Sequence, residues 1–167
     1  MNIVLIGFMG SGKSSVARHL SALLGHACLE MDDLVLEKTG SKDMHEVFAK
    51  GGELLVRETE IAIAKEYAAH SNLVISTGGG VVMNQIILDF FKKNGAKIVY
   101  LQTSFDEIAR RLENDRARPL FQDMQSAKKL YDFRLPLYLN AADLIIDTEG
   151  RSPQEIAIQA QGVLHGI

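Results

Sequence analysis

The sequence predicts an α/β fold in which a parallel β-sheet carries helices on both faces. Short apolar runs that fit buried strands alternate along the 167 residues with longer stretches whose apolar residues recur at helical spacing. The first apolar run, Ile3–Ile6, leads into Gly7–Ser14, which matches the phosphate-loop pattern G-x-x-x-x-G-K-[ST], and a helical pattern begins at Lys13. A strand, a glycine-rich loop and a helix in this order form the context in which the pattern binds phosphate.

Each part of the phosphate loop has a chemical purpose. Its glycines let backbone N–H groups approach phosphate without a Cβ in the way, and the next helix offers unpaired N–H groups and a positive dipole end. We expect Lys13 to reach the β- and γ-phosphates and the Ser14 hydroxyl to ligate Mg²⁺. The predicted nucleotide-phosphate site comprises Gly10, Ser11, Gly12, Lys13, Ser14 and Ser15.

The remaining elements follow in an alternating order. The helix from Lys13 ends at Gly25, and four more strands are expected at Ala27–Leu29, Asn72–Ser76, Lys97–Leu101 and Leu144–Ile146. Short helical segments are expected at Leu34–Lys38 and Met44–Lys50, with a longer helix at Glu53–Ala69. Later helices are expected after a cap at Asn84, around Ile108 and Leu112, from about Ala127, and from Pro153 as a first helical residue.

Composition supports one globular domain over residues 1–167 and limits the classes of partner that it could bind. Hydrophobic residues make up 47% of the chain, and a net charge of −3 argues against a general nucleic-acid or membrane-surface binder. The single cysteine, Cys28, excludes an internal disulfide framework and fits a reducing compartment. The histidines show no metal-ligand spacing, no apolar run reaches membrane-spanning length, and nothing precedes the first strand as a signal peptide, so a cytoplasmic location is expected.

Several polar and glycine-rich segments directly follow the predicted strands. The glycine loop, Glu30 with Asp32, Gly78–Gly80 and Arg151 come just after strands one, two, three and five. Ligands of open parallel sheets bind outside the carboxyl ends of the strands. We therefore expect these segments to share one edge of the sheet.

A phosphate loop alone does not define the reaction, so other residues must. A GTPase would need a guanine-reading Asn-Lys-x-Asp sequence, which is missing, and a motor ATPase should end its third strand in a metal-holding Asp, where this chain has Ser76-Thr77. Transfer of phosphate to a small acceptor remains. That reaction needs a carboxylate beside the acceptor hydroxyl, which Asp32 can supply, although an Asp at this position could equally be a helix N-cap.

Cationic residues set the expected charge of the acceptor. Arg57 and Arg134 could pair with an acidic substrate, since arginine favours planar bidentate contacts, although a lone surface arginine is usually solvated. The backbone of Gly78–Gly80 could touch substrate or form a plain tight turn. Arg116–Leu120 has no usable period and is predicted as a mobile lid that brings Arg118 to the phosphates and excludes water, the alternative being a disordered surface loop.

Taken together, these motifs resemble the shikimate kinase family along essentially the whole chain. The matching segments, in chain order, are Gly7–Ser15, Leu29–Gly40 ending in Lys38-Thr39-Gly40, Phe48–Glu60 around Arg57, Gly78-Gly79-Gly80-Val81, Arg118-Pro119-Leu120, Arg134–Tyr138, and Arg151 with Pro153. The resemblance implies ATP- and Mg²⁺-dependent phosphorylation of the 3-hydroxyl of shikimate, on the route to chorismate and aromatic amino acids. It also implies a five-stranded parallel sheet of order 2-3-1-4-5, as in nucleoside monophosphate kinases, and a monomer.

The resemblance also implies roles for individual residues. Substrate-binding helices would span about residues 31–60 and the lid about residues 112–125. The implied catalytic residues are Asp32, Lys13 and Arg118, and the implied substrate contacts are Asp32, Arg57, Gly78, Gly79, Gly80 and Arg134. The implied nucleotide contacts outside the phosphate loop are Arg111, Arg118, Arg151 and Pro153. The implied Mg²⁺ ligands are Ser14 directly and Glu30 and Asp32 through water.

The chain departs from the family pattern at two positions, and one of them is Val56, which is aliphatic where the family commonly has an aromatic residue beside the substrate pocket. The family usually has Asp-x-Asp after strand two, whereas this chain has Glu30-Met31-Asp32. The extra methylene leaves the metal role of Glu30 open and the second acid intact. The alternatives to a shikimate kinase are another small-molecule P-loop kinase, such as a gluconate kinase, and a non-catalytic nucleotide-binding regulator.

Overall fold

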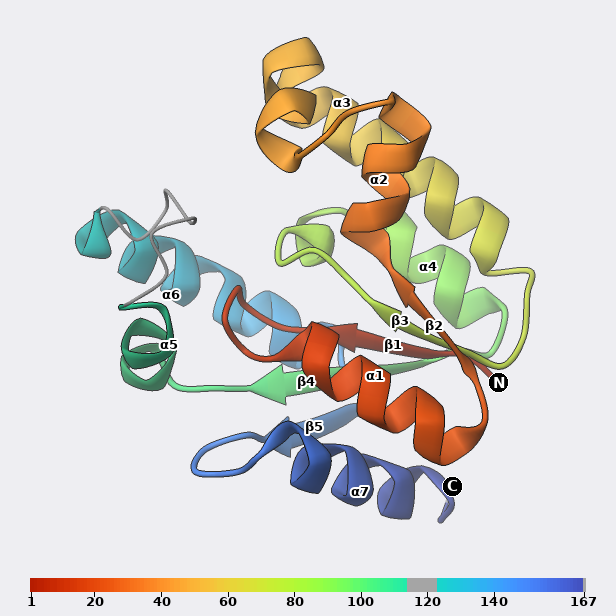
Figure 1. Ribbon diagram of the computed structural model, residues 1–167. Helices are drawn as coiled ribbons and strands as arrows, with labels where there is room; N and C mark the ends of the chain where they lie inside the picture. The colour runs from red at the N-terminus through yellow and green to blue at the C-terminus, as the bar shows by residue number, and fades with distance from the viewer. Residues whose placement is uncertain (114–122, 167) are drawn as a thin grey trace.

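The computed structural model, which describes residues 1–113 and 123–166, alternates strands and helices along the chain (Figure 1). Its elements are β1 Ile3–Ile6, α1 Lys13–Leu24, β2 Ala27–Glu30, α2 Met31–Thr39, α3 Met44–Tyr67, β3 Leu73–Ser76, the 3₁₀ helix η1 Val81–Met83, α4 Gln85–Lys93, β4 Lys97–Gln102, α5 Phe105–Leu112, α6 Met124–Ala141, β5 Leu144–Asp147 and α7 Pro153–Leu164. Every predicted strand is present, and each ends within one residue of its predicted bounds.

The strands of the described chain form one five-stranded parallel sheet. Their order is β2-β3-β1-β4-β5, so the predicted topology is confirmed. β1 lies in the centre, where Val4 pairs with Ile75 of β3 on one side and with Ile98 of β4 on the other. All four residues of β1 are fully buried, as expected for a central strand covered on both faces.

Each face of the sheet has its own apolar core. Alternate β1 residues face opposite ways: Ile3 and Leu5 join a cluster with α1 and α7, while Val4 and Ile6 join a larger cluster with α3, α4 and α6. Figure 1 shows α1 and α7 side by side along one face of the sheet, with both chain termini at the edge opposite the loops that follow the strands. Those loops form the edge at which the predicted functional residues gather.

The prediction for α2 is wrong about where the helix begins, whereas the prediction for α3 is confirmed. α2 begins at Met31 rather than near Leu34, directly after β2, and its N-cap is Glu30, whose side chain makes no capping hydrogen bond. Asp32 therefore stands inside the first turn, and the N-cap role considered for it is wrong. The two helices predicted at Met44–Lys50 and Glu53–Ala69 are confirmed: α3 spans Met44–Tyr67, but Gly52 has non-helical φ 65° and ψ −162° and divides it into two helical segments.

Helix starts later in the chain differ in smaller ways. Asn84 does occupy the N-cap of α4, yet its side chain makes no capping hydrogen bond, and the short helix η1 before it was not predicted. α6 begins at Met124 instead of Ala127, because the Asp123 side chain accepts hydrogen bonds from the N–H groups of Gln125 and Ser126.

The predicted lid and the possibility of a membrane-spanning helix remain to be compared with the structure. The predicted lid, including Arg116 and Arg118, falls mostly on residues 114–122, which lie outside the described residues. Of the helices described, none combines the length and apolar character that crossing a membrane requires.

Candidate active site

The phosphate loop, which leads into α1, has a backbone conformation that requires glycine. Gly10 and Gly12 have φ values of 78° and 90°, in the left-handed region that glycine adopts without strain. A Cβ on Gly10 would also lie only 2.8 Å from Cδ1 of Leu112. Inside the loop, the buried Lys13 Nζ donates hydrogen bonds to the carbonyl oxygens of Gly7 at 2.8 Å and Phe8 at 3.0 Å. The lysine is thereby held on the inner side of the loop.

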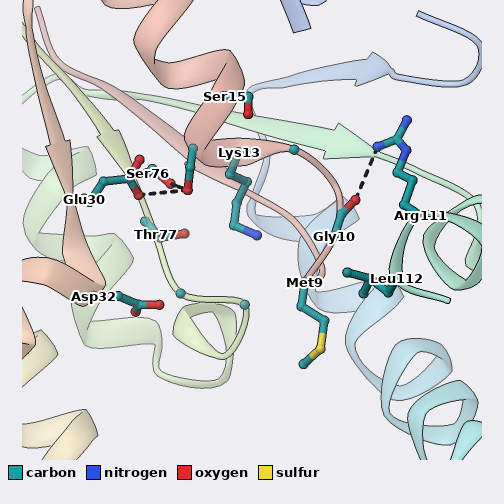
Figure 2. A pocket seen from close by; sticks show the side chains of 14 residues that line it. Met9, Gly10, Lys13, Ser15, Glu30, Asp32, Ser76, Thr77, Arg111 and Leu112 are labelled. Atoms are coloured by element: carbon teal, nitrogen blue, oxygen red, sulfur yellow. Dashed lines mark hydrogen bonds between the residues drawn. The ribbon is translucent and has the colours of Figure 1, made fainter. Parts of the chain in front are cut away.

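A cavity of about 290 Å³ opens beside the phosphate loop (Figure 2). Figure 2 shows Lys13 and Asp32 directed into this cavity from different sides, with Glu30, Ser76 and Thr77 along its wall. The cavity is lined by Met9, Gly10, Gly12, Lys13, Ser14, Ser15, Glu30, Asp32, Ser76, Thr77, Gly78, Gly79, Arg111 and Leu112. These residues follow β1, β2 and β3 or end α5, so the expected gathering at one edge of the sheet is observed.

Hydroxyl and carboxylate oxygens form one wall of this cavity. The Ser14 hydroxyl donates to Oε2 of Glu30 at 3.0 Å and lies 3.5 Å from the Ser76 hydroxyl. The other carboxylate oxygen of Glu30, Oε1, is buried and has no hydrogen-bond partner among the described residues. An unsatisfied buried carboxylate oxygen beside a serine hydroxyl fits a hard cation such as Mg²⁺ or its water shell. No group of three or more His, Cys, Asp or Glu suited to a metal occurs in residues 1–113 and 123–166, so the remaining ligands would be water and phosphate oxygens.

The three-glycine turn after β3 contacts all three predicted acceptor-binding side chains. A Cβ on Gly78 would lie 3.2 Å from Oδ1 of Asp32, one on Gly79 would lie 3.5 Å from Nη1 of Arg134, and one on Gly80 would overlap the guanidinium of Arg57. Side chains at these positions would therefore fill the space between the charged groups. The turn brings a carboxylate from α2 together with arginines from α3 and α6.

Arg57 is held by a carboxylate that the sequence analysis gave no role. Its Nη1 donates to Oε2 of Glu60 at 2.6 Å, and its Nη2 lies 3.3 Å from the exposed Glu53. Glu60 is only 1% exposed, and burial raises its pKa above the ordinary value, although the charge of Arg57 acts in the opposite direction. The spacing of three residues on one helix could have indicated this pair from sequence.

Arg134 approaches the glycine turn from α6. Its guanidinium carbon lies 6.0 Å from the centre of the Phe8 ring, a contact that suits a cation over an aromatic face. Its Nε is buried and has no hydrogen-bond partner among the described residues. A buried donor of this kind is suited to an anionic ligand.

A second cavity, of about 490 Å³, lies on the other side of the phosphate loop. It is lined by Gly10, Ser11, Gly12, Val16, Glu107, Arg110, Arg111, Gly150, Arg151, Pro153 and Ile156. Arg111 lines both cavities, and its Nη1 donates to the Gly10 carbonyl at 3.3 Å (Figure 2). Glu107 accepts from Arg111 at 2.9 Å and from Arg110, and these hydrogen bonds lower the pKa of Glu107 to about 2.

Comparison with known proteins decides which family this arrangement belongs to. The family model described as shikimate kinase matches residues 9–164. The chain belongs to the shikimate kinase family. A shikimate kinase of Streptococcus gordonii is 38% identical over 161 residues, which cover 94% of this chain and 96% of that protein.

Solved shikimate kinases agree with this chain over its whole length. The structure of the Acinetobacter baumannii enzyme in complex with shikimate has a TM-score of 0.90 and 33% identity, covering 99% of this chain and 93% of that one. The structure from Aquifex aeolicus has a TM-score of 0.87 and 32% identity, covering 99% and 97%. ATP and Mg²⁺ are the cosubstrate and metal of shikimate kinases, and the donor set around Ser14 and Glu30 fits that metal.

The predicted site residues fall into three groups in this shikimate kinase fold. Most phosphate-loop residues, Glu30, Asp32, Gly78 and Gly79 line the first cavity, whereas Arg151 and Pro153 line the second. Gly80, Arg57 and Arg134 meet at the glycine turn. Arg118 lies outside the described residues. Sequence reasoning gave no functional role to Glu60, Glu107 and Ser76, because their importance depends on side-chain partners rather than on a motif.

Proposed function

We propose that this chain transfers the γ-phosphoryl group of ATP to the 3-hydroxyl of shikimate, the reaction of its family, with the site residues described above in defined roles. The observation that carries the proposal is the glycine turn Gly78–Gly80, where a carboxylate and two guanidinium groups meet beside the phosphate loop. An acceptor with a carboxylate at one end and hydroxyls at the other matches that distribution of charge.

Arg57 and Arg134 bind the acceptor's carboxylate in this proposal. Arginine pairs with a carboxylate through two parallel N–H donors, and the buried, unpartnered Nε of Arg134 provides one such donor. Glu60 holds Arg57 at 2.6 Å and keeps it directed at the glycine turn. The acceptor is thereby oriented with its hydroxyls toward Asp32.

Asp32 accepts the proton of the attacking hydroxyl. The oxygen of that hydroxyl forms a bond to the γ-phosphorus, the bond from the γ-phosphorus to the β–γ bridging oxygen breaks, and ADP leaves with the electron pair. Lys13 donates hydrogen bonds to phosphate oxygens, on which negative charge accumulates during transfer. Arg118, outside the described residues, is assigned from sequence alone to the same charge.

Ser14 and Glu30 would hold Mg²⁺. Their oxygens stand 3.0 Å apart on the cavity wall, and Asp32 lies on the same cavity and can bind the ion's water. When bound, the metal supplies positive charge to the phosphate oxygens. Arg111, Arg151 and Pro153 are proposed to contact the adenine in the second cavity, beside the phosphate loop.

We also propose a cellular location, a range of partners and an assembly state for this protein. A net charge of −3 and a lone cysteine support a cytoplasmic enzyme that binds neither nucleic acid nor membrane, and a monomer is the simplest assembly. Sedimentation at several protein concentrations tests the last point, since a concentration-dependent mass would contradict it.

A coupled ADP-release assay with ATP and Mg²⁺ tests the function on a panel of acceptors. We expect turnover with shikimate, and at least about a hundredfold lower kcat/KM with gluconate or neutral polyols, because an ill-fitting acceptor leaves the arginines poorly paired. Turnover with gluconate alone would favour the other small-molecule kinases. ATP binding without turnover of any acceptor would favour a nucleotide-binding regulator.

A pair of variants on α6 tests the carboxylate contact. Arg134→Lys should raise the KM for shikimate about tenfold or more, because an ammonium group lacks the guanidinium's paired donors, while the KM for ATP stays the same. Lys129→Gln, an exposed position on the same helix, serves as the control and should alter neither constant. An unchanged KM in Arg134→Lys would remove Arg134 from the binding site.

A further inference from the structure

Tyr138 on α6 makes a long-range contact with the glycine turn that the mechanism above does not use. Its ring is 1% exposed, and its hydroxyl donates a hydrogen bond of 2.5 Å to the carbonyl oxygen of Gly79, which lies 59 positions earlier in the chain. Among the described residues, this is the hydrogen bond that joins α6 directly to the three-glycine turn. It therefore connects the helix that carries Arg134 to the backbone that faces Arg134.

The ring of Tyr138 is itself held in place. It stacks on Tyr100 of β4, with 5.1 Å between ring centres and an angle of 11° between the planes. Tyr100 is also 1% exposed and sits in the interior of the sheet. A rigid strand thus supports the ring, and a buried ring with two side-chain torsions has little freedom left. The hydroxyl is presented to Gly79 at a fixed position.

The Tyr138 hydroxyl keeps its proton, and so remains a donor, at neutral pH. Burial raises the pKa of Tyr138 to about 12, even though the charge of Arg134, a hydrogen bond with the Arg134 side chain and the charge of Arg57 act to lower it. The influence of both arginines also shows that the hydroxyl lies near the two groups proposed to bind the acceptor's carboxylate. Tyr138 therefore stands behind the turn at the point where these side chains meet.

Fixing the Gly79 carbonyl fixes more than one atom. A trans peptide is planar, so its C=O and N–H groups point in opposite directions, and the hydrogen bond from Tyr138 also sets the direction of the Gly80 N–H. Three successive glycines have no side chains with which to anchor themselves and have wide backbone freedom. The carbonyls of Gly78 and Gly80 accept hydrogen bonds from the N–H groups of Val81 and Met83, and the hydrogen bond from Tyr138 anchors the Gly79 carbonyl between them.

We infer that Tyr138 is a positioning residue for the acceptor: it holds the Gly78–Gly80 turn in the conformation that faces Arg57 and Arg134. This inference rests on the proposed function. Tyr138 does not touch the reacting groups, and it acts by preorganising the surface on which the carboxylate end of the acceptor binds. Its loss should therefore weaken acceptor binding and leave nucleotide binding unchanged.

Tyr131, on the same helix, offers a matched control. It is also buried, and its hydroxyl donates to a backbone carbonyl, that of Thr103, at 2.7 Å, so Tyr131→Phe removes a bond of the same kind away from the glycine turn. We expect Tyr138→Phe to raise the KM for shikimate about five- to tenfold, with the KM for ATP within about twofold of wild type. Tyr131→Phe should leave both KM values within about twofold.

Hydrogen exchange provides a second readout that does not depend on turnover. Amides of residues 78–83 should exchange faster in Tyr138→Phe than in Tyr131→Phe, because only the former loses the anchor of the turn. An unchanged KM for shikimate, or equal changes in both KM values, in an active Tyr138→Phe enzyme would overturn the inference alone; so would unchanged exchange. If Tyr138→Phe failed to fold while Tyr131→Phe folded, the role would be general stability and the inference would be wrong. A wild-type enzyme that does not turn over shikimate would instead overturn the proposed function, and the inference with it.

Discussion

At the scale of single residues, the junction between β2 and α2 explains how two carboxylates reach one cavity. The strand ends at Glu30 and the helix begins at Met31, with no loop between them. Met31 is fully buried in the core, while Glu30 and Asp32 on either side of it both line the cavity. The buried methionine anchors the turn, and this arrangement directs the two acids to different partners: Glu30 contacts Ser14, and Asp32 lies at Gly78.

The role of Asp32 can be separated from the effect of a missing charge on α2. Asp32→Asn keeps the shape of the side chain but removes its ability to take a proton, so we expect kcat to fall by about 10²- to 10⁴-fold while ATP binding is retained. Asp33→Asn removes the same charge from the neighbouring exposed position and should change kcat less than about twofold. Steady-state kinetics and nucleotide titration measure both. Near-wild-type kcat in Asp32→Asn would eliminate it as the base.

Glu107 should make the free energy of unfolding fall as the pH becomes acidic. Hydrogen bonds from Arg110 and Arg111 lower the pKa of Glu107 from 4.5 to about 2 in the folded protein. The unfolded chain therefore binds more protons between these values, so this contribution to stability is complete above pH 4.5 and is lost as the pH falls toward 2. Urea denaturation across this range should show a smaller loss of stability in Glu107→Gln than in the wild type. Parallel pH profiles for the two proteins would contradict the assignment.

At the scale of elements, α3 consists of two helical segments that meet at Gly52. The segment from Met44 precedes Gly52, and the segment after it carries Arg57 and Glu60. Gly52 has φ 65° and ψ −162°, a combination that is essentially restricted to glycine. The chain changes direction at this residue, and both segments reach the same apolar core, through Val47 before Gly52 and Val56 after it.

Replacement of Gly52 should be costly for reasons of conformation alone. No atom lies within 4 Å of a Cβ built on Gly52, so Gly52→Ala creates no clash, yet it should destabilise the fold by about 1–3 kcal/mol because alanine avoids this backbone geometry. Gly162→Ala in α7 also meets no neighbour within 4 Å, and in a helical position it should stabilise by about 0.5–1 kcal/mol. Urea denaturation compares the two variants. Equal effects would contradict the conformational explanation.

The sequence pattern predicted the strands better than the helix starts, and the strand order followed from the family resemblance. Apolar runs such as Ile3–Ile6 and Leu73–Ser76 are short and bounded by turn residues, so their ends are clear. The start of α2 had no such signal, since the residue at its N-cap, Glu30, makes no side-chain capping bond and faces Ser14 instead. A long-range contact with Ser14 thus replaced the local signal that marks a helix start.

The candidate site was predictable to the extent that it consists of motifs. The phosphate loop, Asp32, Arg57, Arg134 and the glycine turn were all expected from the sequence, and the structure brings them together at one edge of the sheet. The pair of Glu60 with Arg57 is indicated by its spacing on one helix, but its burial beside the glycine turn is not. The contact of Tyr138 with Gly79 could not be identified from sequence, because it forms only once α6 is packed on the sheet.

At the scale of the whole molecule, β1 joins the two apolar cores. Ile3 and Leu5 belong to the cluster beneath α1 and α7, and Val4 and Ile6 belong to the cluster beneath α3, α4 and α6. The phosphate loop begins where this strand ends. The loop is therefore attached to the most completely buried element of the described chain, which favours a well-defined position for Lys13.

Truncation of a β1 side chain should destabilise the whole fold. Leu5 is fully buried, so Leu5→Ala should lower the free energy of unfolding by about 2–5 kcal/mol through lost burial and the cavity left behind. Leu54, which is 69% exposed on α3, gives a control: Leu54→Ala should change stability by less than about 0.5 kcal/mol. Urea denaturation followed by circular dichroism measures both, and a small effect of Leu5→Ala would show that β1 is less central than its burial implies.

The strand order β2-β3-β1-β4-β5 has a kinetic consequence. In the proposed function, the acceptor binds beside residues that follow β2 and β3, the adenine binds beside residues that follow β5, and the loop after β1 stands between the two. The acceptor and the nucleotide can thus each enter and leave on their own side of the phosphate loop, and neither product blocks the release of the other. Random rather than compulsory order of addition is the behaviour that such a divided sheet edge allows.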